Sequence, residues 1–466
     1  MKKYVYPLLL MLVAPIVLVS CFDDDETIEY DDHCYISGFS LGSLKRTLYT
    51  LSSEGADSAY TTTFAGSSFP MTINQRTATI ENLDSLPVRT NVSAVLATVT
   101  FQGSLAWRKA DLTGLEDTTW TTYNSKDSLD FSDSLHFAVV AADSWSHRIY
   151  TVKVNVHQQR GDTTVWNALG EASALDTLGA RKALCWNDQL VVLGENASGK
   201  LTYVQHPLET TGDWVSVPTT GTENAQISTL QQQGNMLYLS TTLGQVLQSS
   251  NAVNWTEAPY ATRSGLVLAG ASDERLYALV DGKLLSSDGT DEWTEEELDD
   301  SESNLPVAQL SMLNYSQTDG QQKLLLIGEK TGERDAQVWS KTWGTSGEQS
   351  AKWMYYVPNR ADKHRLSVKE NLNVVMYDDG LLAFGGASLD GNHLAMDSVL
   401  YSPDHGISWK PYFNDDMEVD TAIQEAAQAA QYITSAVDED NFLWVVVDSK
   451  VWRGRINRLG FLRQDP

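Results

Sequence analysis

Cysteine and positive charge are both scarce in this chain of 466 residues. Three cysteines exclude a disulfide framework, although one bridge between Cys34 and Cys185 remains possible. Lys and Arg number 33 against 61 Asp and Glu, which gives a formal net charge of −28. A chain this acidic repels nucleic acid and anionic membrane surfaces, so we expect neither as a partner.

Recognisable catalytic, metal and cofactor motifs are also missing. The eight histidines are scattered without the spacings that zinc sites use, and the acidic runs lack the spacing of an EF-hand calcium loop. There is no nucleophile elbow and no glycine-rich phosphate loop. The motifs therefore predict no catalytic residue, no metal and no cofactor.

Long apolar runs are absent except at the N-terminus. Lys2 and Lys3 precede an apolar run over residues 8–17, and Leu-Val-Ser then leads into Cys21. This order predicts a lipoprotein signal peptide over residues 1–20, which is removed when Cys21 receives lipid. The run is too short to span a membrane, so we expect membrane contact through the lipid anchor only. An ordinary secretory signal is the alternative.

Residues 21–33 are strongly acidic and contain no Lys or Arg. Such a segment buries too little apolar area to fold, and we interpret it as a solvated tether. An acidic cluster directly after the acylated Cys resembles the export signal of surface lipoproteins in the Bacteroidetes. The resemblance implies an outer-membrane, lipid-anchored protein exposed on the cell surface; an acidic spacer facing the periplasm is the alternative.

The chain is too long for a single core, and its pattern of apolar and polar residues changes near residues 160–162. Before that point, apolar and polar residues alternate over residues 95–101, 137–140 and 150–156. Alternation of this kind is typical of half-buried strands. We predict an antiparallel, immunoglobulin-like β-sandwich over residues 34–158.

Between residues 162 and 461, one pattern of two strands and a polar loop recurs six times. The first strands lie at residues 190–192, 237–238, 276–277, 324–326, 381–382 and 443–444, and their partners at 199–201, 244–247, 282–285, 336–339, 397–400 and 449–452. Five loops end in an aromatic anchor, namely Trp214, Trp255, Trp293, Trp353 and Trp409. A spacing of about 40 to 60 residues predicts a six-bladed β-propeller, while five or seven blades also fit.

The sixth repeat lacks its own tryptophan, and Trp166 stands before the first repeat instead. We therefore expect residues around Val165 to lend a strand to the last blade, which closes the propeller by an N-terminal strand and covers an open edge. Residues 422–432 are rich in Ala and Gln and form the one convincing helical segment. In our interpretation this helix packs against the last blade; a partner-binding helix is the alternative.

The loop after the fifth pair of strands carries Ser402, Asp404, Gly406 and Trp409. It matches the Ser-x-Asp-x-Gly-x-x-Trp pattern and so resembles the Asp-box repeats of sialidase-like propellers. Short polar side chains hydrogen-bond the turn, Gly accepts positive φ, and the indole packs between sheets. We expect these residues to be structural.

Residues 80–90, Ile-Glu-Asn-Leu-Asp-Ser-Leu-Pro-Val-Arg-Thr, carry a second resemblance. The segment is similar to one in a family of uncharacterised Bacteroidetes surface lipoproteins that couple an immunoglobulin-like domain to an Asp-box propeller. Together with the signal and the repeats, the resemblance covers nearly the whole chain. It implies architecture and location, but no activity and no functional residues.

Positive charge is concentrated in one place, an insertion before the fifth pair of strands that holds Arg360, Lys363, His364, Arg365 and Lys369. A basic loop on an acidic protein suits an anionic glycan or an acidic partner surface; charge balance against neighbouring carboxylates is the alternative.

Trp343, in the preceding insertion, offers a ring for stacking. We therefore predict non-catalytic recognition of a glycan or protein ligand through these six residues.

Two other functions stay open. A sialidase-like hydrolase or lyase at the propeller mouth would need clustered arginines, for which Arg181, Arg263, Arg360 and Arg365 are candidates. The Arg-Ile-Pro signature usual in such enzymes is absent. The second alternative is a structural subunit of an outer-membrane complex, which an apolar patch on a blade flank would favour.

Overall fold

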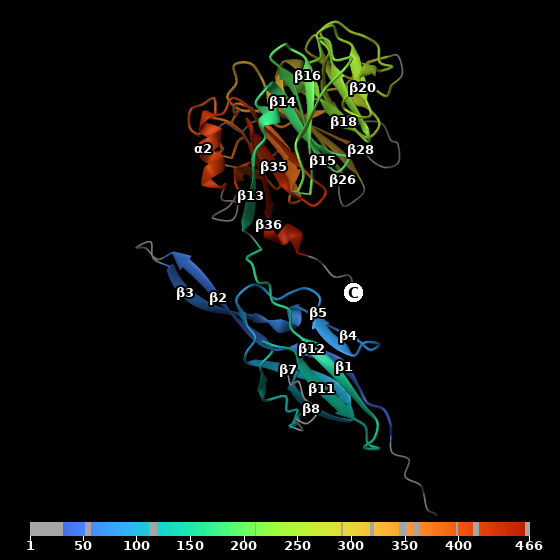
Figure 1. The fold of residues 1–466 in the computed structure, drawn as a ribbon, viewed down its shortest axis with the longest axis vertical. Helices are drawn as coiled ribbons and strands as arrows, with labels where there is room; N and C mark the ends of the chain where they lie inside the picture. Colours follow the sequence, from blue (N-terminus) through green and yellow to red (C-terminus); the bar gives the residue numbers. More distant parts are fainter. Residues whose placement is uncertain are drawn as a thin grey trace, which may run out of the picture. The chain divides into compact units, whose positions relative to one another are not determined.

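The computed structural model describes residues 31–51, 57–110, 119–161, 163–209, 211–289, 292–316, 321–343, 352–357, 364–397, 399–412 and 419–461. The predicted signal peptide, Cys21 and residues 21–30 of the tether lie outside these ranges. The chain divides into two compact units, and the second comprises residues 161–461. Both are built from strands (Figure 1). Within the described ranges, no helix is long and apolar enough to cross a membrane.

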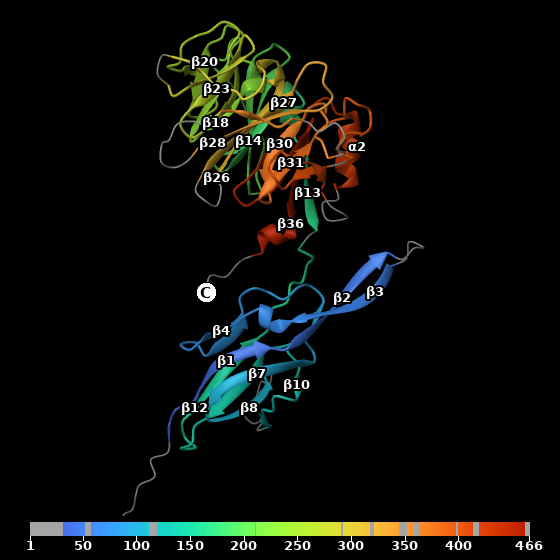
Figure 2. The same ribbon diagram turned by 180° about the vertical axis from the view of Figure 1, so that it is seen from behind.

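The described residues of the first unit form three sheets. One consists of β1 (Tyr35–Leu41), β7 (Val95–Gln102) and β10 (Ser128–Leu129). Another has the order β4 (Met71–Asn74), β5 (Thr79–Asn82), β12 (His147–Lys153), β11 (Leu135–Val140), β8 (Ser104–Lys109) and β9 (Thr121–Thr122). The third consists of β3 (Asp57–Ala65), β2 (Ser43–Leu51) and β6 (Thr90–Asn91). The hairpin β2–β3 extends beyond the rest of this unit (Figures 1 and 2).

The core of the first unit lies between the β1–β7 layer and the β11–β12 layer (Figure 2). Both layers contribute buried side chains to it, including Phe39 from β1 and Phe137 from β11, whose rings meet edge to face at 5.6 Å. The expectation of a purely antiparallel sandwich is wrong at one place, because β12 pairs with β5 in parallel.

The segment at residues 80–90 owes its shape to a buried asparagine. Asn82 is fully buried, its Oδ1 accepts from the Asn155 backbone N–H at 2.7 Å, and its Nδ2 donates to the Asn155 carbonyl at 2.9 Å. Leu86 is also fully buried, and its backbone N–H donates to the same Asn155 carbonyl at 2.8 Å. These bonds attach the segment to the last part of the first unit.

The described residues of the second unit form six four-stranded antiparallel sheets, none of which is closed. Five of these sheets are formed by consecutive strands. Their strands are β14 (Leu178–Trp186), β15 (Gln189–Asn196), β16 (Leu201–Pro207) and β17 (Val215–Pro218); β18 (Gln231–Gln233), β19 (Met236–Ser240), β20 (Val246–Ser249) and β21 (Thr256–Glu257); β22 (Val267–Ala271), β23 (Leu276–Val280), β24 (Lys283–Ser287) and β25 (Thr294–Glu295); β26 (Ala308–Ser316), β27 (Gln322–Glu329), β28 (Gln337–Trp343) and β29 (Met354–Tyr355); β30 (Asn373–Tyr377), β31 (Gly380–Phe384), β32 (Leu400–Ser402) and β33 (Lys410–Pro411).

The sixth sheet joins the two ends of the second unit. Its order is β13 (Thr164–Glu171), β36 (Lys450–Ile456), β35 (Leu443–Val447) and β34 (Ile433–Val437). β13 and β36 lie side by side in both views (Figures 1 and 2), with Trp166 directly opposite Gly454. The segment around Val165 therefore adds the outer strand that the last three strands lack.

We count the strands of the sixth sheet from β34, so that β13 is its fourth strand. The first strands of the six sheets then contact one another in series, from β14 through β34, β30, β26 and β22 to β18. The 3-10 turn over Ile227–Thr229, just before β18, contacts β14. Second strands are the most buried; all five residues of β23, β31 and β35 are buried. Apolar side chains between neighbouring sheets thus supply the core.

The helix α2 (Thr421–Ala429) is shorter than the predicted 422–432. Its N-cap, Asp420, accepts from the Ala422 N–H at 2.9 Å, and Ile423 and Ala427 on one face are buried. They pack in the same cluster as Leu443 and Val445 of β35. Within the described residues, the helix therefore covers the sixth sheet.

Candidate functional site

A cleft of about 370 Å³ lies between β28 of the fourth sheet and the turn that follows β32 of the fifth. We call it the Trp409 cleft, after the tryptophan in its wall. It includes two of the six predicted ligand residues, His364 and Arg365. The described residues that line it are Asp335, Ala336, Val338, Tyr356, Val357, His364, Arg365, Leu366, Gly406, Ile407, Ser408 and Trp409.

The segment that carries His364 and Arg365 is held on both sides by backbone hydrogen bonds. The Ala336 N–H donates to the Leu366 carbonyl at 2.8 Å, and the Trp409 N–H donates to the His364 carbonyl at 3.0 Å. Main-chain bonds of this kind position the two side chains without using their polar groups. The cleft is therefore built on two sheets rather than on a single loop.

Arg365 is paired with Asp335, because its Nη1 donates to Asp335 Oδ2. Both side chains are partly accessible, at 34% for Arg365 and 21% for Asp335. Asp335 is the only carboxylate among the described residues that line the cleft. The pair offers guanidinium donors and a carboxylate acceptor while carrying little net charge.

The opposite wall is a turn held together by its own side chains. Ser402 Oγ accepts from the Gly406 N–H at 2.7 Å, while Asp404 Oδ1 accepts from the Ser408 N–H at 2.8 Å. Gly406 has φ 98°, and a Cβ there would lie 3.0 Å from Val338 Cγ1. Burial acts to raise the pKa of Asp404, but hydrogen bonds from Ser408 and Ser402 outweigh it, so the pKa is lowered.

Apolar groups form the rim of the cleft. Val357 is 70% exposed and Ile407 is 62% exposed, while the ring of Tyr356 stands beside them in the lining. Trp409 is 2% exposed, and its buried indole Nε1 has no hydrogen-bond partner within the described residues. The cleft therefore combines accessible apolar surface with an indole donor whose hydrogen-bonding capacity is unused.

The other predicted ligand residues do not join this cleft. Trp343 ends β28, but its side chain lies outside the described part, as do Arg360 and Lys363 entirely. Lys369 contradicts the expectation of a surface patch, because it is fully buried. The reason is local: Val368 and Lys369 both turn inward, and the backbone of Lys369 bridges to Ser388.

Burial has a clear effect on the Lys369 ammonium. Its Nζ has no hydrogen-bond partner within the described residues. Desolvation lowers its pKa, although the carboxylates of Asp397 and Asp390 act in the opposite direction. Lys369 is therefore a charged group of the interior rather than part of a recognition surface.

The arginines considered for a hydrolase are engaged in separate places. Arg181 in β14 donates from Nη1 to the Asp448 carbonyl at 2.6 Å, and Arg263 donates from Nη2 to the Trp293 carbonyl at 3.5 Å. Arg365 pairs with Asp335, and Arg360 lies outside the described residues. The three described guanidinium groups thus have different partners, which lie in loops of three different sheets.

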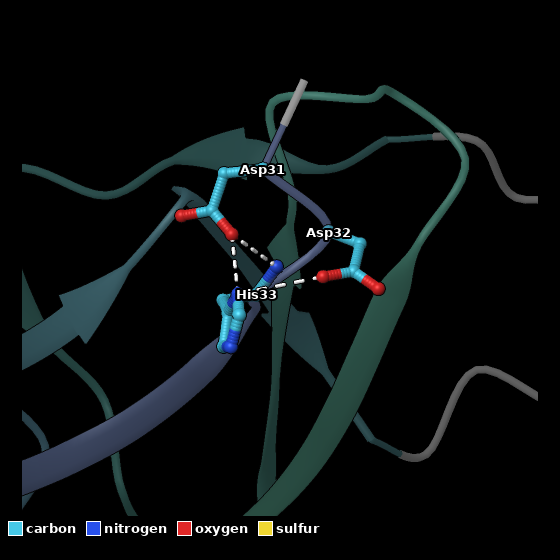
Figure 3. Close-up of side chains that lie close together, drawn as sticks. All are labelled: Asp31, Asp32 and His33. Atoms are coloured by element: carbon cyan, nitrogen blue, oxygen red, sulfur yellow. Dashed lines mark hydrogen bonds and ion pairs between the residues drawn. The ribbon is translucent and has the colours of Figure 1, made fainter. Parts of the chain in front are cut away.

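In the first unit, Asp31, Asp32 and His33 approach one another (Figure 3). The Asp31 carboxylate accepts from the His33 backbone N–H at 2.9 Å and contacts its ring, and Asp32 Oδ1 lies 3.4 Å from His33 Nδ1. The hydrogen bond that the Asp31 carboxylate accepts from the His33 ring raises the pKa of His33. All three residues are exposed neighbours in the chain, and nothing else in the described structure points to a ligand there.

Sequence reasoning missed the apolar rim of the Trp409 cleft. Tyr356 and Val357 follow the predicted anchor Trp353, and Ile407 lies inside the Ser402–Trp409 pattern. Isolated apolar residues in loops are common at protein surfaces, so no sequence signal marks them. Tyr356 and Val357 share a rim with Ile407 only because two segments that are distant in the sequence lie together in the fold.

The chain belongs to a two-domain family. Residues 39–154 match the "Domain of unknown function (DUF6242) N-terminal domain", and residues 160–464 match the "DUF6242 beta propeller domain". The predicted all-β fold with a propeller is thereby confirmed. A comparison with curated proteins gives no match.

Several solved structures are similar to this chain over more than half of its length. The structure "YCF48 bound to D1 peptide" is 12% identical, covers 62% of this chain and 96% of its own, and has a TM-score of 0.35. "SapL1 lectin in complex with alpha methyl fucoside" is 12% identical over 58% and 90%, with a TM-score of 0.36. A glycosyl hydrolase from Bacteroides ovatus is 12% identical over 59% and 82%, with a TM-score of 0.29. Scores this low carry no argument about ligands.

Proposed function

We propose that the protein is a lipid-anchored surface protein whose propeller binds a glycan without cleaving it. Its parts are a lipid on Cys21, an acidic tether, an immunoglobulin-like module and six blades, the last completed by β13. The series of contacts between first strands and the β13–β36 pairing support the six-bladed closure. The order of charged, apolar and small residues before Cys21 supports the anchor.

The Arg365–Asp335 pair is the observation that carries the choice of ligand. A cleft for an anionic group would present an uncompensated cation, whereas Arg365 here is matched by a carboxylate. Paired donors and acceptors suit hydroxyl groups, each of which both donates and accepts hydrogen bonds. The ligand that fits is therefore a neutral sugar. In this proposal a neutral sugar replaces the anionic glycan that the basic loop had suggested.

The apolar rim supports the same choice. One face of a sugar ring carries C–H groups, which pack against exposed apolar or aromatic side chains such as Val357, Ile407 and Tyr356. A single described carboxylate in the cleft gives no support to hydrolysis, because glycoside hydrolases normally use two. Recognition, rather than cleavage, is the function that this arrangement supports.

A glycan array probed with the purified full chain tests the proposal. Ile407→Ser and Arg365→Gln should each lower the binding signal about tenfold, because each removes a contact to a bound sugar. Leu243→Ser is the matched control, since Leu243, in the turn between β19 and β20, is 60% exposed and Ile407 is 62% exposed. The control should keep the full signal.

Two results would contradict the proposal. The first is that no neutral glycan on the array binds. The second is a signal that survives both cleft substitutions, which would place the ligand elsewhere on the protein.

A further inference from the structure

Trp145 is the most exposed large apolar side chain among the described residues, at 87%. It lies in the turn that joins β11 to β12 in the first unit. Asp143 orders this turn, because its Oδ1 accepts from the Trp145 N–H at 2.9 Å and from the Ser146 N–H at 2.8 Å. The Ala141 N–H closes the turn by donating to the Ser146 carbonyl at 2.9 Å. A fixed backbone therefore presents the indole to solvent, and little backbone entropy is lost when the indole makes a contact.

The described chain begins beside this turn. Asp31 Oδ2 accepts from Gln102 Nε2 at 3.3 Å, at the end of β7. Hydrogen bonds from Ser146 lower the pKa of Asp143, and Asp31 is near enough for its charge to act in the opposite direction. Both views show the start of the described chain next to the turn between β11 and β12 (Figures 1 and 2).

A second aromatic ring lies at the same end of the first unit. Tyr35 is the first residue of β1, pairs with Gln102 and is 41% exposed. Trp and Tyr are enriched where a membrane meets water, because each ring combines an apolar body with a polar group that hydrogen-bonds at the headgroup level. This end of the unit thus carries the two side chains that are typical of a membrane interface.

The length of chain before Asp31 limits how far this end lies from a lipid on Cys21. Asp31 is the tenth residue after Cys21, and ten fully extended residues span at most about 35 Å. The strand β12 runs away from the turn, from His147 to Lys153, over about 20 Å. The turn that carries Trp145 is therefore closer to the start of the tether than the far end of β12 is.

We propose that Trp145 and Tyr35 rest in the headgroup region of the bilayer that holds the lipid on Cys21. The inference rests on the proposed lipid anchor. It adds a second membrane contact to the lipid, which the sequence predicts as the only one. Such a contact holds the first unit against the bilayer, so that its orientation is not left to the tether.

The bilayer that suits this end is one of zwitterionic lipid. Three carboxylates lie near the two rings, on Asp31, Asp32 and Asp143, and each is repelled by an anionic surface. The exposed rings interact with headgroups and the upper acyl region without needing a lipid charge.

A dye in the turn tests the proposal. Ala142 is exposed, so Ala142→Cys can carry a nitrobenzoxadiazole dye, whose emission shifts to shorter wavelength when it leaves water. The chain starts at residue 22, keeps every described residue, and carries Cys34→Ala and Cys185→Ala so that no other thiol reacts. An N-terminal hexahistidine tag holds it on phosphatidylcholine vesicles that contain nickel-chelating lipid. The emission should shift to shorter wavelength when the vesicles are added.

Trp145→Ser should lower the ratio of docked to free protein about fivefold or more, because the largest apolar contact is lost. Leu96→Ser is the matched control, since Leu96 is 49% exposed at the other end of β7 and should not touch the bilayer. It should keep the full shift. The same dye on Lys153→Cys, at the far end of β12, should show no shift.

Three outcomes would overturn the proposal: the dye in the turn does not shift on the vesicles, Trp145→Ser shifts as much as the parent chain, or vesicles with added phosphatidylglycerol give a larger shift than phosphatidylcholine alone. The tag replaces the lipid, so the dye experiment does not depend on acylation. The mass of the chain extracted from cell membranes tests acylation of Cys21 separately. An unacylated Cys21 would refute the proposed anchor, whereas a silent dye on the tagged chain would refute only the membrane contact.

Discussion

Closure of the propeller by β13 can be tested at Gly454. Gly454 lies opposite Trp166 in the β13–β36 pairing, and the indole covers it. A Cβ at Gly454 would lie 2.3 Å from Trp166 Cε3 and 2.6 Å from Cδ2. The indole would have to leave its position on β36, and overpacking of this kind costs about 1–3 kcal/mol. Gly454→Ala should therefore destabilise the second unit by that amount.

Gly179→Ala in β14 is the matched control. There the added Cβ would lie 3.5 Å from the Glu195 carbonyl oxygen and 3.5 Å from Tyr432 Oη, which are ordinary contacts. Removing a glycine where space allows typically stabilises a protein by about 0.4–1 kcal/mol. The free energy of unfolding, measured by urea denaturation with tryptophan fluorescence, should thus fall for Gly454→Ala and stay level or rise for Gly179→Ala.

A Trp166→Ala background isolates the cause. Without the indole, Gly454→Ala should cost less than about 0.5 kcal/mol, because the clash is gone and the two positions are coupled. Equal costs with and without the indole would refute the reasoning, as would equal effects of Gly454→Ala and Gly179→Ala. Either result would mean that Trp166 does not hold β13 against β36.

Three further substitutions have expected outcomes. Asn82→Ala removes the acceptor of the Asn155 N–H and should lower the unfolding free energy of the first unit by about 2–3 kcal/mol in urea denaturation; a loss under about 0.5 kcal/mol would contradict the role of that network. Lys369→Met should raise stability at pH 7, because burial disfavours the ammonium and lowers its pKa. The unfolded chain binds the extra proton below the ordinary Lys pKa of about 10.4, so this gain should shrink as pH rises toward that value, and a pH-independent gain would argue against the explanation. Burial, and then nearby Lys323, lower the pKa of His405, so the parent chain should lose stability as pH falls through the ordinary His value of about 6.5. His405→Asn should flatten that slope in melting curves of the second unit between about pH 8 and 5, and an unchanged slope would disprove the assignment.

The sequence-based prediction located the middle of each sheet but not its edges. The predicted pairs lie in second and third strands, such as β23 and β24, because these are buried on both faces and read as apolar runs. The first strand of the second sheet, β18, consists of three glutamines and carries no apolar signal. Last strands such as β21 have two residues, too few for any period to show.

The candidate site shows the same division. A run of positive charges pointed to His364 and Arg365, and both line the Trp409 cleft. The same run suggested Lys369, which is buried. A charge run says nothing about which way each side chain faces, since that depends on the strand and turn that hold it.

What the sequence determined by itself was the repeat, the tryptophan anchors and the need for a strand from the other end. These are local properties of composition and spacing, and four of the five anchors are buried. Only the tertiary structure decided which residues share a cleft. The Arg365–Asp335 pair and the rim at Val357 and Ile407 arise where the fourth and fifth sheets meet. Contacts between sheets depend on the packing of distant segments, which no spacing along the chain records.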